Sequence, residues 1–242
     1  MLAGAWRNPR DLASLIAAVA AGSMAIACRE GTRYGGWVIA LIDYGAGNLR
    51  SVQKALLHLG AQVRLAQTAD DMRGAAGVVL PGVGAFDDCM NAMRRQALEA
   101  ALVGAIREGL PFLGICVGYQ ALFERSEEFQ SSAPGLRVFQ GPVVRFPTQP
   151  GLKVPQIGWN QVEWTRADCP LVQGIPSGTH FYFVHSYFPQ PAEASIVVGR
   201  TDYGLNFASA VWRQNVFATQ FHPEKSQEAG LTLLRNFVAM AK

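Results

Sequence analysis

The pentapeptide Gly114-Ile115-Cys116-Val117-Gly118 places a cysteine between two glycines. An apolar run, PFLGI at 111–115, leads into it, which predicts a strand-to-helix junction at Cys116. Two glycines at such a junction allow the sharp turn that lifts a nucleophile above a sheet. A helix that begins at about Val117 would also stabilise a thiolate at Cys116 through its dipole. Most free cysteines are small buried residues, but the flanking glycines favour a nucleophile here.

A histidine and a glutamate stand two residues apart in Phe221-His222-Pro223-Glu224, just after a predicted strand at 216–220. Residues two apart in an extended segment point to one side. Glu224 can therefore orient the His222 imidazole while the other ring nitrogen exchanges a proton with a thiol, as in a nucleophilic triad. The alternative is a surface histidine beside a solvated glutamate.

The other three histidines offer less. His58 lies off the apolar stripe of its predicted helix and is expected to face solvent. His180 and His185 lie in the aromatic segment THFYFVHSYF, where both can be core residues. The base of the site is therefore expected at His222.

A glycine-rich loop, Leu80-Pro81-Gly82-Val83-Gly84, follows another predicted strand. The carboxyl ends of neighbouring parallel strands lie side by side, and ligands bind there. The backbone N–H groups of Val83 and Val117 are therefore predicted to form an oxyanion hole. The alternative is a plain turn in which glycine only supplies a positive φ.

These loops require a sheet that brings them together. Short apolar strands are predicted at 38–42, 62–66, 78–80 and 111–115. Helical spacing of apolar residues fills 49–59 and then 86–109, where Ala97 and Ala101 share one predicted apolar stripe. This alternation predicts an α/β fold, a doubly wound and mostly parallel sheet with helices on both faces.

The second half of the chain is punctuated by Gly, Pro and aromatic residues, which predicts an antiparallel extension of the sheet. Short strands are expected at 143–146, 153–157, 180–184, 195–199, 208–212 and 216–220. A last amphipathic helix is expected from about Gln227 to Met240. One domain over residues 37–242 accounts for all of these elements.

Composition excludes several classes of protein. Of 242 residues half are apolar and 16% are charged, and the net charge is +3, which fits neither a disordered chain nor a nucleic-acid binder. Four cysteines lie far apart without a C-x-x-C pair, and no P-loop, G-x-G-x-x-G or H-E-x-x-H motif is present. No metal, cofactor or disulfide framework is therefore expected.

The N-terminal segment differs from the rest. Residues 12–28 carry no charge and follow Arg7 and Arg10, which is the layout of a signal peptide. The alternatives are an appended helix, or residues upstream of the true start, with 29–36 as a linker. We expect 1–36 to be an N-terminal extension and the protein to be cytoplasmic, without a membrane partner.

The motifs described above carry a resemblance to a known family. GICVGYQ with Cys116, TQFHPEKS with His222 and Glu224, and VVLPGVGAF resemble the triad (class I) glutamine amidotransferases. Three further segments, IDYGAGNLRSV, KVPQIGWN and FYFVHSY, resemble one branch of them, the glutaminase subunits of imidazole glycerol phosphate synthases. The resemblance extends from about Val38 to Lys242.

The resemblance implies a reaction. Cys116 would attack the side-chain amide carbon of L-glutamine, with His222 taking and returning the proton and Glu224 orienting His222. Ammonia would leave, and water would release glutamate from a γ-glutamyl thioester. The substrate-binding positions implied by the family are Gly82, Gln120, His185 and Ser186.

A partner subunit is implied as well. The ammonia would pass to a cyclase, a (β/α)₈ barrel, that forms imidazole glycerol phosphate and aminoimidazole carboxamide ribotide in histidine biosynthesis. Such a barrel needs ~250 residues, so the cyclase must be a second polypeptide of a heterodimer.

Three other readings remain open. The chain can be a subunit that feeds ammonia to anthranilate or nucleotide synthesis, although IDYGAGN and GWN weigh against this. A peptidase or γ-glutamyl hydrolase of similar fold would fit the export-like N-terminus. A non-enzymatic protein that kept the fold is disfavoured by the intact set of Cys116, His222 and Glu224.

Overall fold

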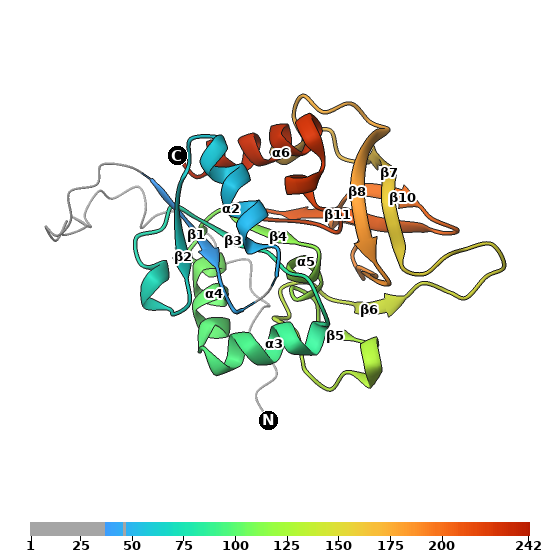
Figure 1. The fold of residues 1–242 in the computed structure, drawn as a ribbon, viewed down its shortest axis with the longest axis horizontal. Coiled ribbons are helices and arrows are strands. Elements are labelled where there is room, and N and C mark those ends of the chain that lie inside the picture. Colours follow the sequence, from blue (N-terminus) through green and yellow to red (C-terminus); the bar gives the residue numbers. More distant parts are fainter. Residues whose placement is uncertain (1–36, 46) are drawn as a thin grey trace, which may run out of the picture. The chain divides into compact units, whose positions relative to one another are not determined.

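The computed structural model describes residues 37–45 and 47–242. Residues 1–36, including the apolar stretch at 12–28, lie outside the described residues. A nine-stranded sheet forms the centre of the described part (Figure 1). In sheet order its strands are β2 (Gln62–Ala66), β1 (Val38–Ile42), β3 (Gly77–Leu80), β4 (Phe112–Ile115), β12 (Val216–Thr219), β11 (Asn206–Arg213), β10 (Val197–Asp202), β7 (Gln156–Trp164) and β8 (Thr179–His185).

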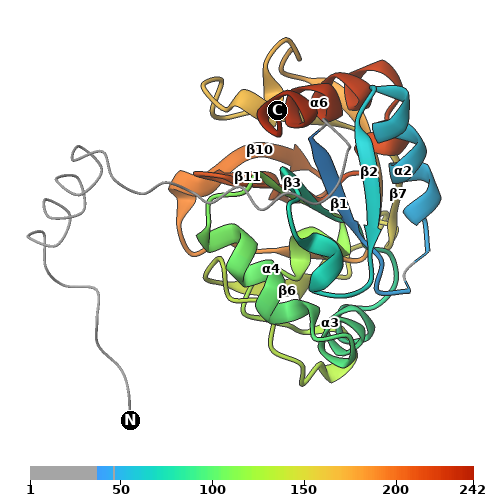
Figure 2. The ribbon, with the colours of Figure 1, turned by 90° about the vertical axis from the view of Figure 1, so that its left-hand side faces the viewer.

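The sheet changes direction in its middle. From β2 to β12 all neighbouring strands are parallel, whereas from β12 to β8 they are antiparallel. The helices are α2 (Leu49–His58), α3 (Phe86–Arg95), α4 (Leu98–Arg107), α5 (Val117–Gln120) and α6 (Gln227–Met240). Helices α2 and α6 cover one face of the parallel part and α3 and α4 the other (Figure 2). The predicted doubly wound fold with an antiparallel extension is confirmed.

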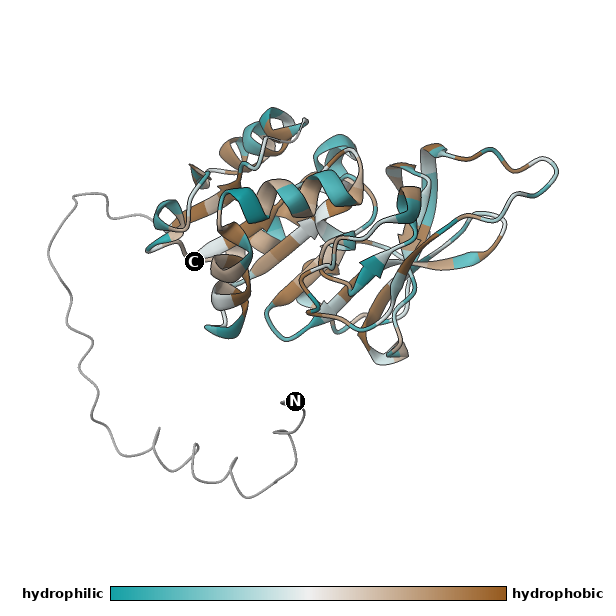
Figure 3. Cartoon of the chain, turned by 90° about the horizontal axis from the view of Figure 1, so that it is seen from below, coloured by the Kyte–Doolittle hydropathy of each residue, from teal (hydrophilic) through white to brown (hydrophobic). Residues whose placement is uncertain are grey.

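Local sequence explains the parallel strands. β3, β4 and β12 are buried along their whole length, because helices or neighbouring segments cover both of their faces. Such strands are continuous apolar runs rather than alternating ones. The helices alternate between polar and apolar residues instead, which Figure 3 shows as teal and brown along each helix. Their apolar sides pack on the sheet, as Val52 and Leu56 of α2 do.

The prediction of one long helix at 86–109 is wrong. The chain breaks into α3 and α4, with Ala97 at φ 53° between them. The break turns Leu98 and Leu102 into the core with no exposed surface. Ala97 and Ala101, which the prediction placed on the buried stripe, are exposed and half-buried. Packing of the leucines therefore overrides the local apolar periodicity.

The strand predicted at 153–157 is displaced. β7 begins at Gln156 and continues to Trp164, pairing with β8 from Gln156–His185 to Val162–Thr179. Its exposed residues include the apolar Ile157 and Trp159 as well as polar ones, so apolar residues do not mark the buried side of this strand. Strand β10 also begins later than predicted, at Val197, after a short 3₁₀ turn η4 (Ala194–Ile196).

The structure contains a second sheet of three strands, and only its strand near 143–146 was predicted. It consists of β5 (Arg125–Ser126), β6 (Pro142–Arg145) and β9 (Tyr187–Pro189). The remaining 3₁₀ turns are η1 (Asp70–Met72), η2 (Glu128–Gln130), η3 (Pro170–Val172) and η5 (Pro223–Lys225).

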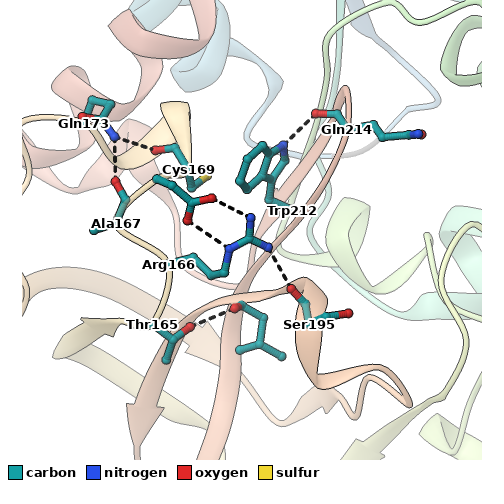
Figure 4. Close-up of polar contacts among 10 residues, drawn as sticks. Thr165, Arg166, Ala167, Cys169, Gln173, Ser195, Trp212 and Gln214 are labelled. Carbon is teal, nitrogen blue, oxygen red and sulfur yellow. Dashed lines mark hydrogen bonds and ion pairs between the residues drawn. The ribbon is translucent and has the colours of Figure 1, made fainter.

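The segment between β7 and η3 is fixed to the antiparallel strands by one arginine (Figure 4). Arg166 forms a two-pronged ion pair with Asp168, donates to the Ser195 carbonyl and stacks 4.6 Å from the centre of the Trp212 ring. The ion pair is exposed and contributes little by itself. The combined contacts fix the segment after β7 to Ser195 and to Trp212 of β11.

Candidate active site

The sheet order brings the predicted motifs to one edge. The segments that follow β1, β3, β4 and β12 contain DYGAGN, PGVG, Cys116 and FHPE respectively. All four strands are parallel, so their carboxyl ends meet at that edge. Ligands bind at such edges in open α/β sheets.

The turn at Cys116 is a sharp elbow. Cys116 has φ 54° and ψ −106°, which is outside the regions that a residue with a side chain normally adopts. The two glycines make the elbow possible: a Cβ on Gly118 would lie 1.9 Å from the Leu80 carbonyl oxygen, and one on Gly114 2.7 Å from the Gly118 oxygen. A side chain at either position would therefore clash with the backbone, which supports the expectation that both glycines are required at this junction.

The helix after Cys116 is shorter than expected. α5 contains only four residues, Val117–Gln120, so its dipole is small. Stabilisation of a thiolate must then come mainly from other groups around the sulfur.

His222 and Glu224 form a buried pair. His222 Nδ1 lies 2.7 Å from Glu224 Oε1, and the two side chains are 1% and 0% exposed. His222 Nε2 is buried and has no hydrogen-bond partner among the described residues. Burial by itself lowers the pKa of His222, but the charges of Cys116 and then Glu224 outweigh it and raise this pKa to about 10. This direction favours a protonated ring paired with a thiolate.

A further residue contacts Glu224. Asn48 Nδ2 donates to Glu224 Oε1 at 2.5 Å, from the end of the DYGAGN segment. Among the described residues, Asn48 and His222 are the only side chains that bond to this carboxylate, and Glu224 Oε2 is buried without a partner. Asn48 therefore keeps a buried carboxylate oriented toward the imidazole.

A pocket of about 410 Å³ opens above Cys116. Its walls come from the loop after β3, the elbow, η2, β8 and β9; the lining residues are Val83, Gly84, Cys116, Val117, Gln120, Glu128, Pro155, Val184, His185, Ser186, Tyr187 and Lys225. The volume is within the usual range of small-molecule sites.

The predicted substrate-binding positions lie at or beside this pocket. Gln120, His185 and Ser186 line it. Gly82 lies behind the wall, where a Cβ would approach Tyr44 Oη to 2.7 Å and Gly118 N to 2.8 Å. Gly82 thus permits the close packing of the loop on the elbow.

The ring of His185 is occupied by other contacts. Nδ1 donates to the Tyr187 carbonyl at 2.8 Å, and Nε2 lies 3.0 Å from the side-chain amide of Gln156. Burial lowers the pKa of His185 to about 3, so the ring is neutral. Both ring nitrogens are thus engaged by contacts within the fold, and residues 185–186 line the pocket.

Sequence reasoning missed Glu128. Its half-buried side chain lines the pocket, and Oε2 accepts the Phe86 N–H at 2.7 Å. Burial raises the pKa of this carboxyl. Glu128 is the acidic side chain in the pocket wall and is suited to an ammonium group of a ligand.

The two predicted oxyanion donors also border the pocket. Val83 and Val117 line it from opposite loops, and neither N–H donates to a backbone carbonyl among the described residues. Gly84, next to Val83, has φ 99°, a conformation that glycine adopts freely. No cluster of three His, Cys, Asp or Glu residues that could hold a metal occurs in the described part.

Comparison with known proteins gives the family. The family model for class-I glutamine amidotransferases matches residues 40–241. The chain belongs to this family. Among solved structures, this amidotransferase chain is similar to "Crystal structure of glutamine amidotransferase" (TM-score 0.65, 21% identity, 84% of this chain and 98% of that one). It also resembles a chain of the PurLQS structure from Thermotoga maritima (TM-score 0.68, 18% identity, 86% and 100% covered). These likenesses show the fold.

Closer relatives identify the branch of the amidotransferase family. The chain is 51% identical over 199 residues to imidazole glycerol phosphate synthase subunit HisH of Moorella thermoacetica, covering 82% of this chain and 93% of the relative. It is 49% identical to subunit HisH of Syntrophotalea carbinolica, covering 83% and 98%. The resemblance of the IDYGAGN and GWN segments to this branch is confirmed.

The contact of Asn48 leads to a prediction for this amidotransferase. Asn48→Ala is expected to lower kcat for glutamine hydrolysis by roughly tenfold or more, because a hydrogen bond to a buried charge contributes on the order of 1.5–3 kcal/mol. Steady-state kinetics of the variant and of Asn160→Ala, an amide that bonds to the Asp202 carbonyl instead, provide the measurement and its control. Equal kcat in the wild type and Asn48→Ala would contradict the positioning role.

Proposed function

We propose that the chain is the glutamine-hydrolysing subunit of an imidazole glycerol phosphate synthase. The observation that carries this proposal is the buried His222–Glu224 pair, which faces Cys116 at the floor of a pocket in a chain about 50% identical to HisH subunits. The substrate is L-glutamine and the products are glutamate and ammonia. Glutamate release by the chain in complex with its partner, and its loss when Cys116 is replaced, is the experiment that tests the proposal.

The reaction begins from a thiolate and an imidazolium. The Cys116 sulfur attacks the amide carbon of glutamine, and the negative charge moves to the amide oxygen. His222, held by Glu224, gives its proton to the leaving nitrogen, so that ammonia departs and a γ-glutamyl thioester remains. His222 then takes a proton from water as the water attacks the thioester, and glutamate leaves with the thiolate restored.

The pocket accounts for the orientation of glutamine. Gln120 Nε2 donates to the Tyr187 carbonyl and to Gln220 Oε1, so its own carbonyl oxygen is the end left for a ligand. Together with Glu128, this oxygen would hold the α-ammonium group. The backbone at His185 and Ser186 would hold the α-carboxylate, and the N–H groups of Val83 and Val117 would stabilise the charged oxygen.

A second polypeptide receives the ammonia in this proposal. The relatives are named as subunits, which implies a partner. We propose a barrel-type cyclase in a heterodimer, with imidazole glycerol phosphate as its product and no nucleic acid or membrane involved. A cytoplasmic location fits the free thiols of Cys89, Cys116 and Cys169, since reducing compartments preserve free thiols.

Residues 1–36 are proposed to be an extension ahead of the catalytic domain at 37–242. The family match begins at residue 40, and the relatives align with 82–84% of the chain. Among the described residues, no helix is both long and apolar enough to cross a membrane.

The isolated chain is expected to be a poor glutaminase that its partner activates. Turning the Gly82–Val83 peptide requires changes in ψ of Gly82 and φ of Val83, and β-branched Val83 resists a positive φ. Two orientations of the Val83 N–H are therefore separated by a few kcal/mol, and only one donates into the pocket. A missing oxyanion donor costs about 10²–10³ in rate.

The measurement is glutamate release by the chain alone, with cyclase, and with cyclase plus its nucleotide ligand. Rates are expected to rise in that order. Three equal rates would contradict the proposal that the partner turns the Gly82–Val83 peptide.

A further inference from the structure

One side chain donates a hydrogen bond to the sulfur of Cys116. Gln220, directly after β12, has no exposed surface, and its Nε2 donates to Cys116 Sγ at 3.6 Å. Gln220 and His222 are two residues apart in an extended segment, so both side chains reach the same side. The sulfur thus has a neutral amide donor at hydrogen-bond distance, in addition to the nearby His222.

The two hydrogen-bonding contacts of the sulfur favour opposite protonation states. The Val184 carbonyl oxygen lies 4.0 Å from Sγ and can only accept, so it interacts with the neutral S–H. The Gln220 amide donates, so it interacts best with the thiolate. At 3.6 Å the amide contact is the closer of the two, and a donor to a charged form stabilises that form.

Other contacts fix the orientation of the Gln220 amide. Its Oε1 accepts from Gln120 Nε2 at 3.3 Å, and Gln120 Nε2 also donates to the Tyr187 carbonyl at 3.0 Å. Since Gln120 presents its donor end to Gln220, the oxygen of the Gln220 amide must face Gln120. The NH₂ group is then left facing the sulfur.

We propose that Gln220 is a further catalytic residue, whose amide N–H donates to the Cys116 thiolate and lowers the affinity of the resting thiol for its proton. The inference rests on the proposed function, in which Cys116 is the nucleophile. As the sulfur bonds to the amide carbon of glutamine, its charge moves to the oxygen and the hydrogen bond weakens. Gln220 therefore acts on the resting enzyme and increases the fraction that is ready to attack.

The titratable groups around the sulfur allow a clean test. Burial raises the pKa of Tyr44 and raises the pKa of Cys89 to about 12, and both groups face Cys116 from neighbouring elements. Between about pH 5 and 9 neither changes charge, and His185 is neutral. A change in the pH dependence of thiol reactivity on replacing Gln220 therefore does not come from Tyr44, Cys89 or His185. Glu224, Glu128 and Lys225 also border the site and are unchanged in every variant compared.

The experiment is the pH dependence of alkylation of Cys116 by iodoacetamide in the full chain, with the modified peptide quantified by mass spectrometry. Gln220→Met and Gln220→Leu both remove the donor without adding a titratable group beside the sulfur. The acid limb is the part of the profile in which the alkylation rate rises with pH. For both variants this limb is expected to move to higher pH by about one pH unit, so that alkylation below the midpoint of the rise is roughly tenfold slower. At alkaline pH, where the thiolate is complete, the rates are expected to converge.

Gln156→Met is the matched control. Gln156 is also a buried glutamine near the pocket, but its amide contacts His185 rather than the sulfur. Its acid limb is expected to coincide with that of the wild type. An unchanged limb in both Gln220 variants, or an equal shift in Gln156→Met, would overturn the proposal.

The experiments distinguish a failure of the proposed function from a failure of this inference. If the wild type with its partner releases no glutamate, the proposed function is wrong, while the alkylation profile still reports whether Gln220 acts on the thiol. If glutamate is released and the acid limb does not depend on Gln220, the function stands and the inference is wrong.

Discussion

Replacing Cys116 by alanine is expected to abolish glutamine-dependent synthesis by the complex and to leave ammonia-dependent synthesis intact. Cys116 is the one nucleophile at the floor of the described pocket, and no other thiol among the described residues lines it. Without the sulfur no thioester forms, so glutamine releases no ammonia. In the proposed function the partner consumes ammonia whatever its source, so external ammonia bypasses the step.

The measurement is product formation with glutamine and, separately, with ammonium salt. Cys169→Ala serves as the control, since Cys169 is also a fully buried free thiol but lies beside η3 rather than in the pocket. It is expected to lose some stability through packing and to keep both activities. Near wild-type synthesis from glutamine by Cys116→Ala would show that the nucleophile is elsewhere.

The second large effect is expected at His222. In the proposed mechanism His222→Ala removes both the charge that pairs with the thiolate and the acid that protonates the leaving nitrogen, so kcat should fall on the order of 10⁴. Glu224→Ala should lower kcat by less, because this carboxylate touches the imidazole and not the substrate. The comparison requires kcat of both variants under one set of conditions, with folding checked by circular dichroism.

His58→Ala is the control for loss of a histidine, because His58 ends α2 on the exposed side of the helix. Equal losses in the His222 and Glu224 variants, or a larger loss in Glu224→Ala, would contradict the division of roles. A complete loss in His185→Ala with folding intact would return His185 as a candidate base.

The parallel half of the fold could be predicted because its signals are local. The bounds of β1, β2 and nearly of α2 agree with the apolar runs and helical spacing of the sequence. The break at Ala97 could not be predicted, because it depends on how Leu98 and Leu102 pack against the core. The extent of β7 depends on its pairing with β8, which the sequence of β7 does not signal, because Ile157 and Trp159 are exposed rather than buried.

The candidate site also has a part that the sequence predicted and a part that it did not. Cys116, His222 and Glu224 stand in short motifs whose spacing has a geometric meaning. Asn48 and Glu128 were missed because their partners are 176 and 42 residues away, respectively. The Asn48–Glu224 contact exists only once the fold has brought the loops after β1 and β12 to the same edge of the sheet, although β3 and β4 lie between these two strands.

The most direct test of the central claim follows the nitrogen. Glutamine carrying a heavy isotope at its side-chain amide is supplied to the chain and its cyclase, with ordinary ammonium in the buffer. We predict that imidazole glycerol phosphate carries the heavy nitrogen and that the label disappears in Cys116→Ala. Product nitrogen drawn from the buffer by the wild type, with no glutamate released, would contradict the account.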